Sequence, residues 1–291
     1  MPHERGRKPQ ILRSNTARKH IIDHPDPSKP YEERTRVSES ISSEAQYGNW
    51  VSTKLLLVPG ALGLIFAGAA LFIPLIGVLS AILLAIAVYF TYARYLFSPG
   101  GRDIQGKIQS LVLDRLRDWD GKGKVLDIGC GNGALTIRMA KRFPRAEVVG
   151  IDSWGGRWEY SRGVCEANAE IEGVGERVVF RRGSASSLPF DEGAFDVVVS
   201  NLVFHEVRDV RDKRLLIEEA LRVVRKGGWF VFQDLILWKQ VYGELDDLLA
   251  TIGSWGIEKV EFVDTSDSDF IPKALKLPFM LGTVGIIHGR R

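Results

Sequence analysis

The residues from Val125 to Gly133, VLDIGCGNG, restrict the possible fold of this chain more than any other stretch. β-prone side chains and Asp127 run directly into a glycine-rich turn, and residues 134–141 follow as a predicted helix. A strand, a tight turn and a helix N-terminus in this order are typical of a site for a nucleotide-like ligand, because unpaired backbone N–H groups point toward it. The chain after this turn is therefore expected to complete an α/β sheet.

β and α patterns alternate after the turn. We predict strands at 124–128, 147–151, 178–181, 195–200, 228–234, 257–263 and 282–289. Helices between most of them predict a mainly parallel sheet that is covered on both faces. Upstream, apolar side chains recur at helical spacing over 103–119, which predicts an amphipathic helix.

The 39 residues from Leu55 to Ala93 carry no charged side chain. A bilayer core is crossed by about 20 helical residues, and a single helix of this length would measure about 58 Å. Two helices fit, with a break at Pro74, because proline removes a backbone donor and disfavours a helical residue before it. Small residues would let the two backbones approach each other closely: Gly60, Gly63, Ala67 and Gly68. We predict a two-pass transmembrane hairpin over 51–97; a buried hairpin of a soluble protein is the alternative.

Residues 1–50 are polar and proline-rich, and the net charge of +3 arises within residues 1–54. We interpret 1–50 as a disordered basic tail that either contacts anionic lipids or sets the membrane topology. The basic residues on both sides of the hairpin place both termini and the domain at 98–291 on the cytoplasmic side of the membrane. The two cysteines, Cys130 and Cys165, form no CxxC pair or Cys/His cluster, so no metal site is expected.

Two acids are placed for ligand chemistry at strand ends. Asp127 lies two residues before Gly129, where its carboxylate would repel a pyrophosphate and attract a cation such as the ammonium of S-adenosylmethionine. Asp152 ends the next predicted strand, where an acid can accept hydrogen bonds from both ribose hydroxyls. Gly129, Gly131 and Ala134 also satisfy a dinucleotide-binding fingerprint, so an NAD-dependent oxidoreductase stays open as an alternative.

A series of short motifs follows this turn in a fixed order: Gly150-Ile151-Asp152, Gly183-Ser184-Ala185, Leu188-Pro189-Phe190, Phe195–Ser200 and Arg222–Gly228. With Val125–Gly133, they make residues 103–291 resemble the class I (Rossmann-like) S-adenosylmethionine-dependent methyltransferases, particularly the small-molecule type. The resemblance implies a seven-stranded sheet whose last strand is antiparallel and is inserted beside the fifth. It also implies S-adenosyl-L-methionine as the cofactor and a small-molecule acceptor.

The resemblance further implies a cofactor site of Asp127, Gly129, Cys130, Gly131, Gly133, Asp152, Ser153, Trp154, Ser184, Ala185 and Asn201. Asp127, Gly129 and Gly131 would line the methionine and ribose portion, Asp152 would hold the ribose, and Ser153 and Trp154 would border the adenine. Ser184 and Ala185 stand where the family often has an acid that binds the adenine amino group. Asn201 would lie near the sulfonium.

Methyl transfer requires a general base only when the acceptor is protonated. The candidates after the fourth strand are His205 and Glu206. We predict His205 as the base or an acceptor contact, with Asn201 near the sulfonium, whereas a structural histidine is the alternative and Glu206 is better explained by a helix start or a salt bridge. Trp154 and Trp158 would form a lid if they do not pack in the core.

The chain lacks the Asn/Asp-Pro-Pro-aromatic motif of enzymes that methylate nucleobases, and residues 55–291 are electrically neutral, so no nucleic-acid substrate is expected. The hairpin favours a membrane-anchored methyltransferase with a lipophilic or membrane-associated acceptor. A non-catalytic S-adenosylmethionine-binding or scaffold protein is the alternative from another class.

Overall fold

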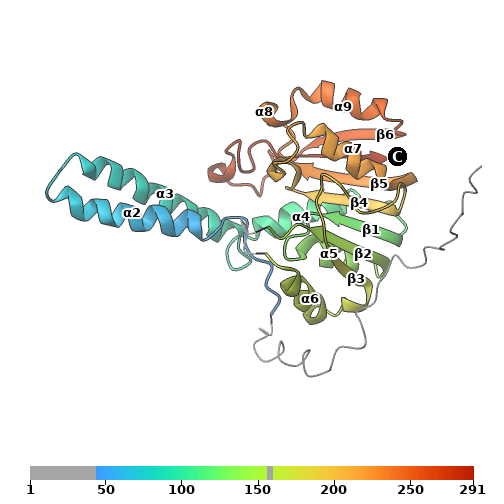
Figure 1. The fold of residues 1–291 in the computed structure, drawn as a ribbon, viewed down its shortest axis with the longest axis horizontal. Coiled ribbons are helices and arrows are strands. Elements are labelled where there is room, and N and C mark those ends of the chain that lie inside the picture. The colour runs from blue at the N-terminus through green and yellow to red at the C-terminus, as the bar shows by residue number, and fades with distance from the viewer. Residues whose placement is uncertain (1–43, 156–159) are drawn as a thin grey trace, which may run out of the picture. The chain divides into compact units, whose positions relative to one another are not determined.

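The computed structural model describes residues 44–155 and 160–291. Two apolar helices, α2 (Lys54–Ala70) and α3 (Ile76–Phe97), come first and run antiparallel to each other (Figure 1). The remaining elements are α4 (Ile104–Asp114), β1 (Lys122–Ile128), α5 (Ala134–Arg142), β2 (Arg145–Asp152), α6 (Arg162–Ile171), η2 (Gly175–Arg177), β3 (Val178–Arg182), β4 (Phe195–Asn201), η3 (Phe204–Glu206), α7 (Arg214–Arg222), β5 (Val224–Asp234), α8 (Lys239–Tyr242), α9 (Leu245–Ser254), β6 (Lys259–Asp264), η4 (Lys273–Leu275) and β7 (Gly285–Arg290).

The seven strands form one sheet in the order β3-β2-β1-β4-β5-β7-β6. Strands β1 to β5 pair in parallel, and β7 pairs antiparallel with both β5 and β6. The predicted seven-stranded sheet, with its antiparallel last strand beside the fifth, is therefore confirmed. Because the order reverses at β1 and β4, the carboxyl ends of these two strands lie where an α/β sheet leaves a crevice for a ligand.

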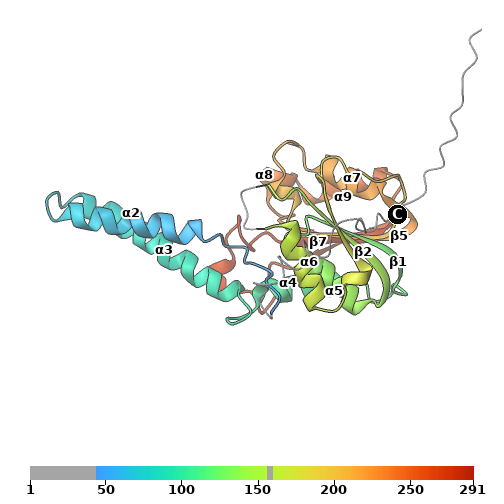
Figure 2. The same cartoon turned by 60° about the horizontal axis from the view of Figure 1, so that its bottom comes forward.

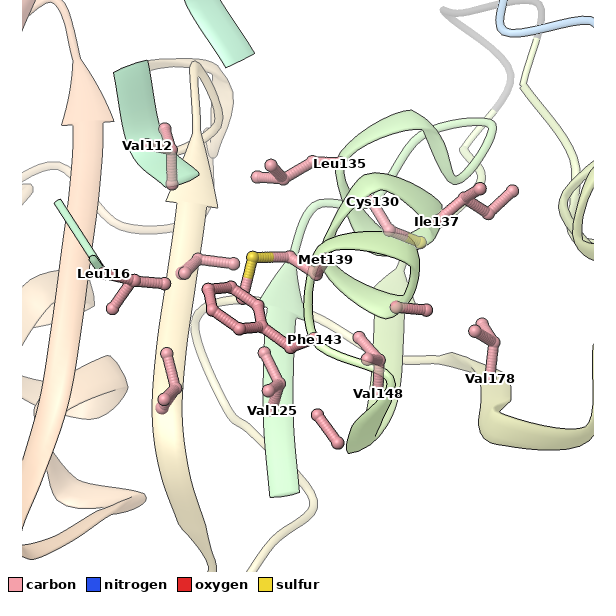
Figure 3. Close-up of a cluster of buried hydrophobic side chains, with 14 of the residues drawn as sticks. Val112, Leu116, Val125, Cys130, Leu135, Ile137, Met139, Phe143, Val148 and Val178 are labelled. Carbon is pink, nitrogen blue, oxygen red and sulfur yellow. The ribbon is translucent and has the colours of Figure 1, made fainter. Parts of the chain in front are cut away.

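Alternate residues of the central strands pack on opposite faces of the sheet. Val125, Val197 and Val199 belong to the cluster beneath α4, α5 and α6, whereas Leu126 and Val198 face α7 and α9. Figure 2 shows these two helix layers on either side of the sheet. In the first cluster, Met139 and Phe143 from α5 and its end lie over Val125 and Val148 (Figure 3). This two-sided burial explains why the strands are almost continuously apolar.

The predicted helix over 103–119 ends earlier, at Asp114. The following turns are closed by bonds between residues three apart, such as Leu116 N–H to the Leu113 carbonyl oxygen at 3.0 Å. Such tighter turns are common at helix ends. Trp119 nevertheless reaches the core, where its ring packs edge-on against Phe143 with 4.8 Å between ring centroids.

The hairpin breaks at Leu71–Leu75, around Pro74, as predicted. A Cβ at Gly63 would lie 2.8 Å from Leu84 Cγ, so this glycine brings the two helices into close contact, whereas a Cβ at Gly68 would meet nothing within 4 Å. The Ser80 hydroxyl also crosses the interface and donates to the Gly63 carbonyl oxygen at 2.7 Å. Of the described helices, α3 is long and apolar enough to cross a membrane, and α2, with 17 residues, is a shorter apolar helix.

The base of the hairpin packs against the sheet domain. Ala93, Leu96 and Phe97 are buried in a third cluster with Ile104 and Ile108 of α4. The Arg94 guanidinium donates to the Val51 carbonyl oxygen, which fixes the chain before α2 to the end of α3. The predicted basic tail at 1–50 lies almost entirely outside the described residues.

Candidate functional site

A cavity of about 620 Å³ opens at the carboxyl ends of β1, β2 and β4. This volume is within the range of small-molecule sites. The sheet side of the cavity is built from the turn after β1, the end of β2, the loop after β3 and the end of β4. Each of these segments follows a parallel strand, so the topology brings residues far apart in sequence to one edge.

The glycine turn after β1 is held in shape by its neighbours. Gly129, Gly131 and Gly133 all have positive φ angles, of 74°, 58° and 83°. A Cβ at Gly129 would lie 2.2 Å from a methyl carbon of Val203, and a Cβ at Gly133 would lie 2.9 Å from the Phe180 ring. These two glycines therefore permit close packing within the domain, and Gly129 and Gly131 line the cavity.

Asp152, at the end of β2, organises this turn. Its carboxylate accepts hydrogen bonds from the Gly131 N–H at 2.9 Å and from the Trp154 N–H at 2.8 Å. A carboxylate has room for about four donors. The remaining lone pairs can therefore accept hydrogen bonds from ligand hydroxyls.

Asp127 is buried beneath the turn and is 1% exposed. Its carboxylate accepts a hydrogen bond from the Thr136 hydroxyl at 2.6 Å. Burial raises the pKa of Asp127 to about 7, and the charge of nearby Asp152 adds to this shift, although the Thr136 hydrogen bond opposes it. A cation placed against this carboxylate would remove the penalty for its charge.

At the end of β4, the Asn201 side chain lies at the cavity wall. Its buried Oδ1 has no hydrogen-bond partner among the described residues. Since a buried polar atom without a partner costs about 1–3 kcal/mol, this oxygen favours a ligand that donates to it. Across the cavity, the Ser184 hydroxyl is 2.7 Å from that of Ser186.

The chain leaves β4 through a turn that Asp234 holds. Leu202 has a φ of 56°, which is unusual for a leucine. The N–H groups of Val203 and Phe204 then donate to Asp234 Oδ2 at 3.1 and 2.8 Å. Asp234 ends β5, which pairs directly with β4, so its wholly buried carboxylate lies beside this turn.

His205 follows in the same turn, and its Nδ1 is 2.6 Å from Asp234 Oδ1. Its other ring nitrogen, Nε2, is 3.6 Å from Glu206 Oε1. Burial alone would lower the pKa of His205, but the charge and hydrogen bond of Asp234 outweigh it and raise the pKa. Burial likewise acts to raise the pKa of Asp234, but the contact with His205 prevails and lowers it. The pair therefore favours an imidazole that binds a proton readily.

The opposite wall of the cavity comes from segments outside the predicted cofactor-binding and catalytic residues. They contribute mostly aromatic and apolar side chains, together with two glutamines of α4: Tyr47, Trp50, Phe97, Gln105, Gln109, Phe279, Met280 and Leu281. Hydrogen bonds hold the residues before α2 against α6 and the residue that follows it. The Asn168 side chain accepts from the Gln46 N–H at 2.7 Å and donates to the Gln46 carbonyl oxygen at 3.1 Å, and the Tyr47 hydroxyl donates to Glu172 at 2.9 Å.

The structure thus brings most of the predicted site residues together. Asp127, Gly129, Cys130, Gly131, Asp152, Ser153, Ser184, Ala185, Asn201 and His205 all line the cavity. Gly133 and Trp154 do not. The Trp154 indole N–H instead donates to the Gly131 carbonyl oxygen at 2.9 Å, and the ring packs against the core. Trp158 lies outside the described residues. Asp234 was missed, although an acid at the end of a parallel strand was a visible signal.

Comparison with known proteins is consistent with this geometry. Residues 126–232 match the family model described as "Methyltransferase domain". The chain is 31% identical over 147 residues to the demethylmenaquinone methyltransferase of Roseiflexus castenholzii, covering 47% of this chain and 57% of that protein. It is 33% identical over 125 residues to the Staphylococcus aureus protein of the same name, covering 41% of this chain and 48% of that protein. It is 30% identical over 114 residues to an uncharacterized Haemophilus influenzae protein, covering 39% of this chain and 43% of that protein. The chain spans about half the length of the curated relatives it matches.

Among solved structures, the fold is similar to geranyl diphosphate C-methyltransferase from Streptomyces coelicolor. Two complexes of that enzyme with S-adenosyl-L-homocysteine give TM-scores of 0.50 and 0.51 at 16% identity, covering 65% of this chain and 80% and 77% of the other. At this identity the likeness concerns the fold. Together with the family match, the sheet order and the cavity, it identifies a class I S-adenosylmethionine-dependent methyltransferase domain around residues 126–232.

Proposed function

We propose that this chain transfers the methyl group of S-adenosyl-L-methionine to a small, lipophilic acceptor in the cavity at the carboxyl ends of β1, β2 and β4. The observation that carries the proposal is that one cavity is lined by Asp127, Asp152 and Asn201, which retain hydrogen-bond acceptor capacity, and by His205, whose Nδ1 contacts Asp234. The names of the two demethylmenaquinone methyltransferases agree with a lipophilic acceptor.

The residues of the sheet side fit the cofactor. Asp127 is a buried carboxylate suited to an ammonium group, and Asp152 keeps acceptor capacity for ribose hydroxyls. The unpartnered Asn201 Oδ1 offers an acceptor between these acids and His205. S-adenosylmethionine supplies an activated methyl group on a sulfonium, so the protein needs chiefly to position the acceptor and exclude water.

His205 is proposed to take the acceptor's proton. The Asp234 carboxylate accepts a hydrogen bond from His205 Nδ1–H, which fixes the tautomer and leaves the Nε2 lone pair for a proton from the acceptor. The carboxylate of Glu206, 3.6 Å from Nε2, would stabilise the imidazolium that forms. This arrangement serves transfer to an oxygen, nitrogen or carbon that loses a proton.

The hairpin at 51–97 is proposed to anchor the chain in a membrane. It would join the tail at 1–50 to the catalytic domain at 98–291, and both termini would lie on the cytoplasmic side. Its outward side chains support this: Leu64, Phe72 and Val88 are 68, 87 and 69% exposed. Exposed apolar surface of this extent is typical of membrane or partner contact. The aromatic and apolar wall of the cavity is contributed by the hairpin base and the segments tied to it, so an acceptor from the bilayer would meet this wall first.

Isothermal titration of the full-length chain in lipid nanodiscs with S-adenosylmethionine and, separately, with NADH tests the cofactor assignment. The full chain is required because Tyr47, Trp50 and Phe97 line the cavity. Binding of S-adenosylmethionine is expected. Binding of NADH alone would refute the proposal and favour an oxidoreductase. Cofactor binding without methyl transfer to any component of a membrane extract would favour a non-catalytic binding protein.

Alkaline carbonate extraction of membranes that contain the full chain tests the anchor. The chain is expected to stay in the pellet, because peripheral proteins are released at high pH while spanning helices remain in the lipid. Release into the supernatant would refute the transmembrane assignment without affecting the cofactor assignment.

A further inference from the structure

We propose that an apolar groove along α3 holds the hydrocarbon chain of the methyl acceptor while its polar head lies in the cavity. The acceptor would then be a molecule with a methylatable head and a long isoprenoid or alkyl chain. This inference rests on the proposed methyltransferase function and specifies its substrate class.

The groove has a volume of about 460 Å³ and lies between α3 and the loop before β7. It is lined on the helix side by Ile82, Ala85, Ile86 and Phe90 and on the loop side by Leu277 and Phe279. The ring of Tyr89 completes it. All of these side chains are apolar or aromatic, so the groove suits a hydrocarbon and offers little to a polar group.

Phe279 connects the groove to the cavity, because its side chain lines both. The next residue, Met280, also lines the cavity. The Tyr89 hydroxyl oxygen lies 2.9 Å from both the Ala274 carbonyl oxygen and the Met280 sulfur, which share its single proton, so the loop is held against α3 at this junction. A chain that leaves the cavity past Phe279 therefore enters a groove with a fixed wall.

The groove is proposed to align the acceptor more than to increase its affinity. Lipid tails are as apolar as leucine, so apolar burial alone does not favour the groove over the bilayer, and a chain is retained there by the polar head that the cavity holds. The effect of the groove is to fix the direction of the chain, which places the attached head at the cavity.

Photo-crosslinking tests this inference. The probe is geranylgeraniol that carries a diazirine in its chain, added to the full-length protein in phosphatidylcholine nanodiscs. The label is expected on residues 82–90 and 277–279. Excess unlabelled geranylgeraniol should compete with it, whereas additional phosphatidylcholine should not.

Matched variants locate the label. Ala85→Trp fills the groove and should reduce labelling by about tenfold, which corresponds to a loss of about 1.4 kcal/mol in binding free energy. Val88→Trp, at a position 69% exposed and outside the groove, should leave labelling unchanged. Ile86→Trp fills the same groove if the first variant does not fold, as judged by thermal unfolding.

Labelling spread evenly over α2 and α3, or labelling that Ala85→Trp leaves intact in a folded protein, overturns the groove inference. Calorimetry with S-adenosylmethionine on the native nanodiscs separates this failure from that of the proposed function. If the cofactor binds and the label is scattered, the groove inference alone fails. If the cofactor does not bind, the proposed function fails, whatever the label shows.

Discussion

Replacement of Asp234 by asparagine examines the role of the His205 pair directly. The Asp234 carboxylate is wholly buried and accepts hydrogen bonds from the N–H groups of Val203, Phe204 and Leu235, the last at 2.7 Å, in addition to its contact with His205 Nδ1. Asparagine keeps the volume and one acceptor oxygen but removes the charge. The variant therefore keeps the packing volume while removing the charge and the hydrogen bonds that one of the two oxygens accepts.

The expected effect has two parts. General-base catalysis contributes about 10²–10⁴-fold, so loss of the oriented imidazole should lower the methyl-transfer rate by up to this factor, about 3–5 kcal/mol of barrier. The pH profile should also move. The native rate should rise with pH through an apparent pKa above 6.5, because Asp234 raises the pKa of His205 despite burial. Without the Asp234 charge, burial and the charge of Lys213 lower the pKa of His205 and only Glu206 still raises it, so the rise should move to lower pH.

The assay is transfer of tritiated methyl from S-adenosylmethionine to a membrane extract by the full chain in nanodiscs, measured across pH. Asp212→Asn is the matched control, because Asp212 is an exposed carboxylate paired with Arg214. Calorimetric cofactor binding confirms that each variant is folded. An unshifted pH profile in Asp234→Asn, or a His205→Gln variant with the native rate, would refute the assignment of His205 as the base.

The same pair predicts how stability depends on pH. His205 has a raised pKa in the folded chain, so its contribution to stability is fully present below its unfolded value of about 6.5 and is lost as pH rises through the folded pKa. Thermal unfolding of the native chain should therefore show a loss of stability in that window. The loss should be absent in His205→Gln.

Three further predictions concern other parts of the chain. Asp127 has a pKa of about 7, so binding of a cationic ammonium at pH 7 should release a fraction of a proton from its carboxyl. The calorimetric binding enthalpy should therefore vary with the ionisation enthalpy of the buffer. Asp127→Asn should abolish this variation. Gly63→Ala should lower thermal stability by about 1–3 kcal/mol through overpacking against Leu84, whereas Gly68→Ala, whose Cβ meets nothing, should be neutral or slightly stabilising; equal effects would contradict the packing argument. Asn168→Leu should release Gln46 from the cavity wall and make the 44–51 segment sensitive to protease, without unfolding the sheet.

The sheet could be predicted because its signals are local. Each strand has its own apolar run, and the turn after Ile128 and the break at Pro74 are set by glycine and proline, which act within a few residues. The cavity residues at strand ends follow from the same pattern, since parallel strands place their carboxyl ends at one edge. The end of α4 could not be read, because the following residues keep a helical spacing while forming tighter turns.

The far wall of the cavity could not be predicted for a different reason. Trp50 and Phe279 reach the same cavity from opposite ends of the chain, and each is positioned by tertiary contacts. The Trp50 N–H donates to the Gln105 side chain, and the Tyr89 hydroxyl contacts the Met280 sulfur. Both contacts join residues that lie far apart in the sequence. The hydrogen bond from the Trp154 indole N–H to the Gly131 carbonyl oxygen also joins residues that no local sequence pattern connects.

Two buried aspartates in this domain show how surroundings, more than residue type, assign a role. Asp234 accepts three backbone N–H bonds and faces an imidazole, so its pKa is lowered and it stays charged to orient His205. Asp127 accepts from the Thr136 hydroxyl and lies near the like charge of Asp152, so burial prevails and raises its pKa to about 7. A carboxylate whose hydrogen bonds are satisfied is suited to hold another side chain in place. A carboxylate that lacks a counter-charge at the wall of a cavity is suited to a cationic ligand. If the ammonium group of the cofactor binds beside Asp127, it should displace the proton of this carboxyl, so proton release on cofactor binding is the most direct measure of where the ammonium group lies.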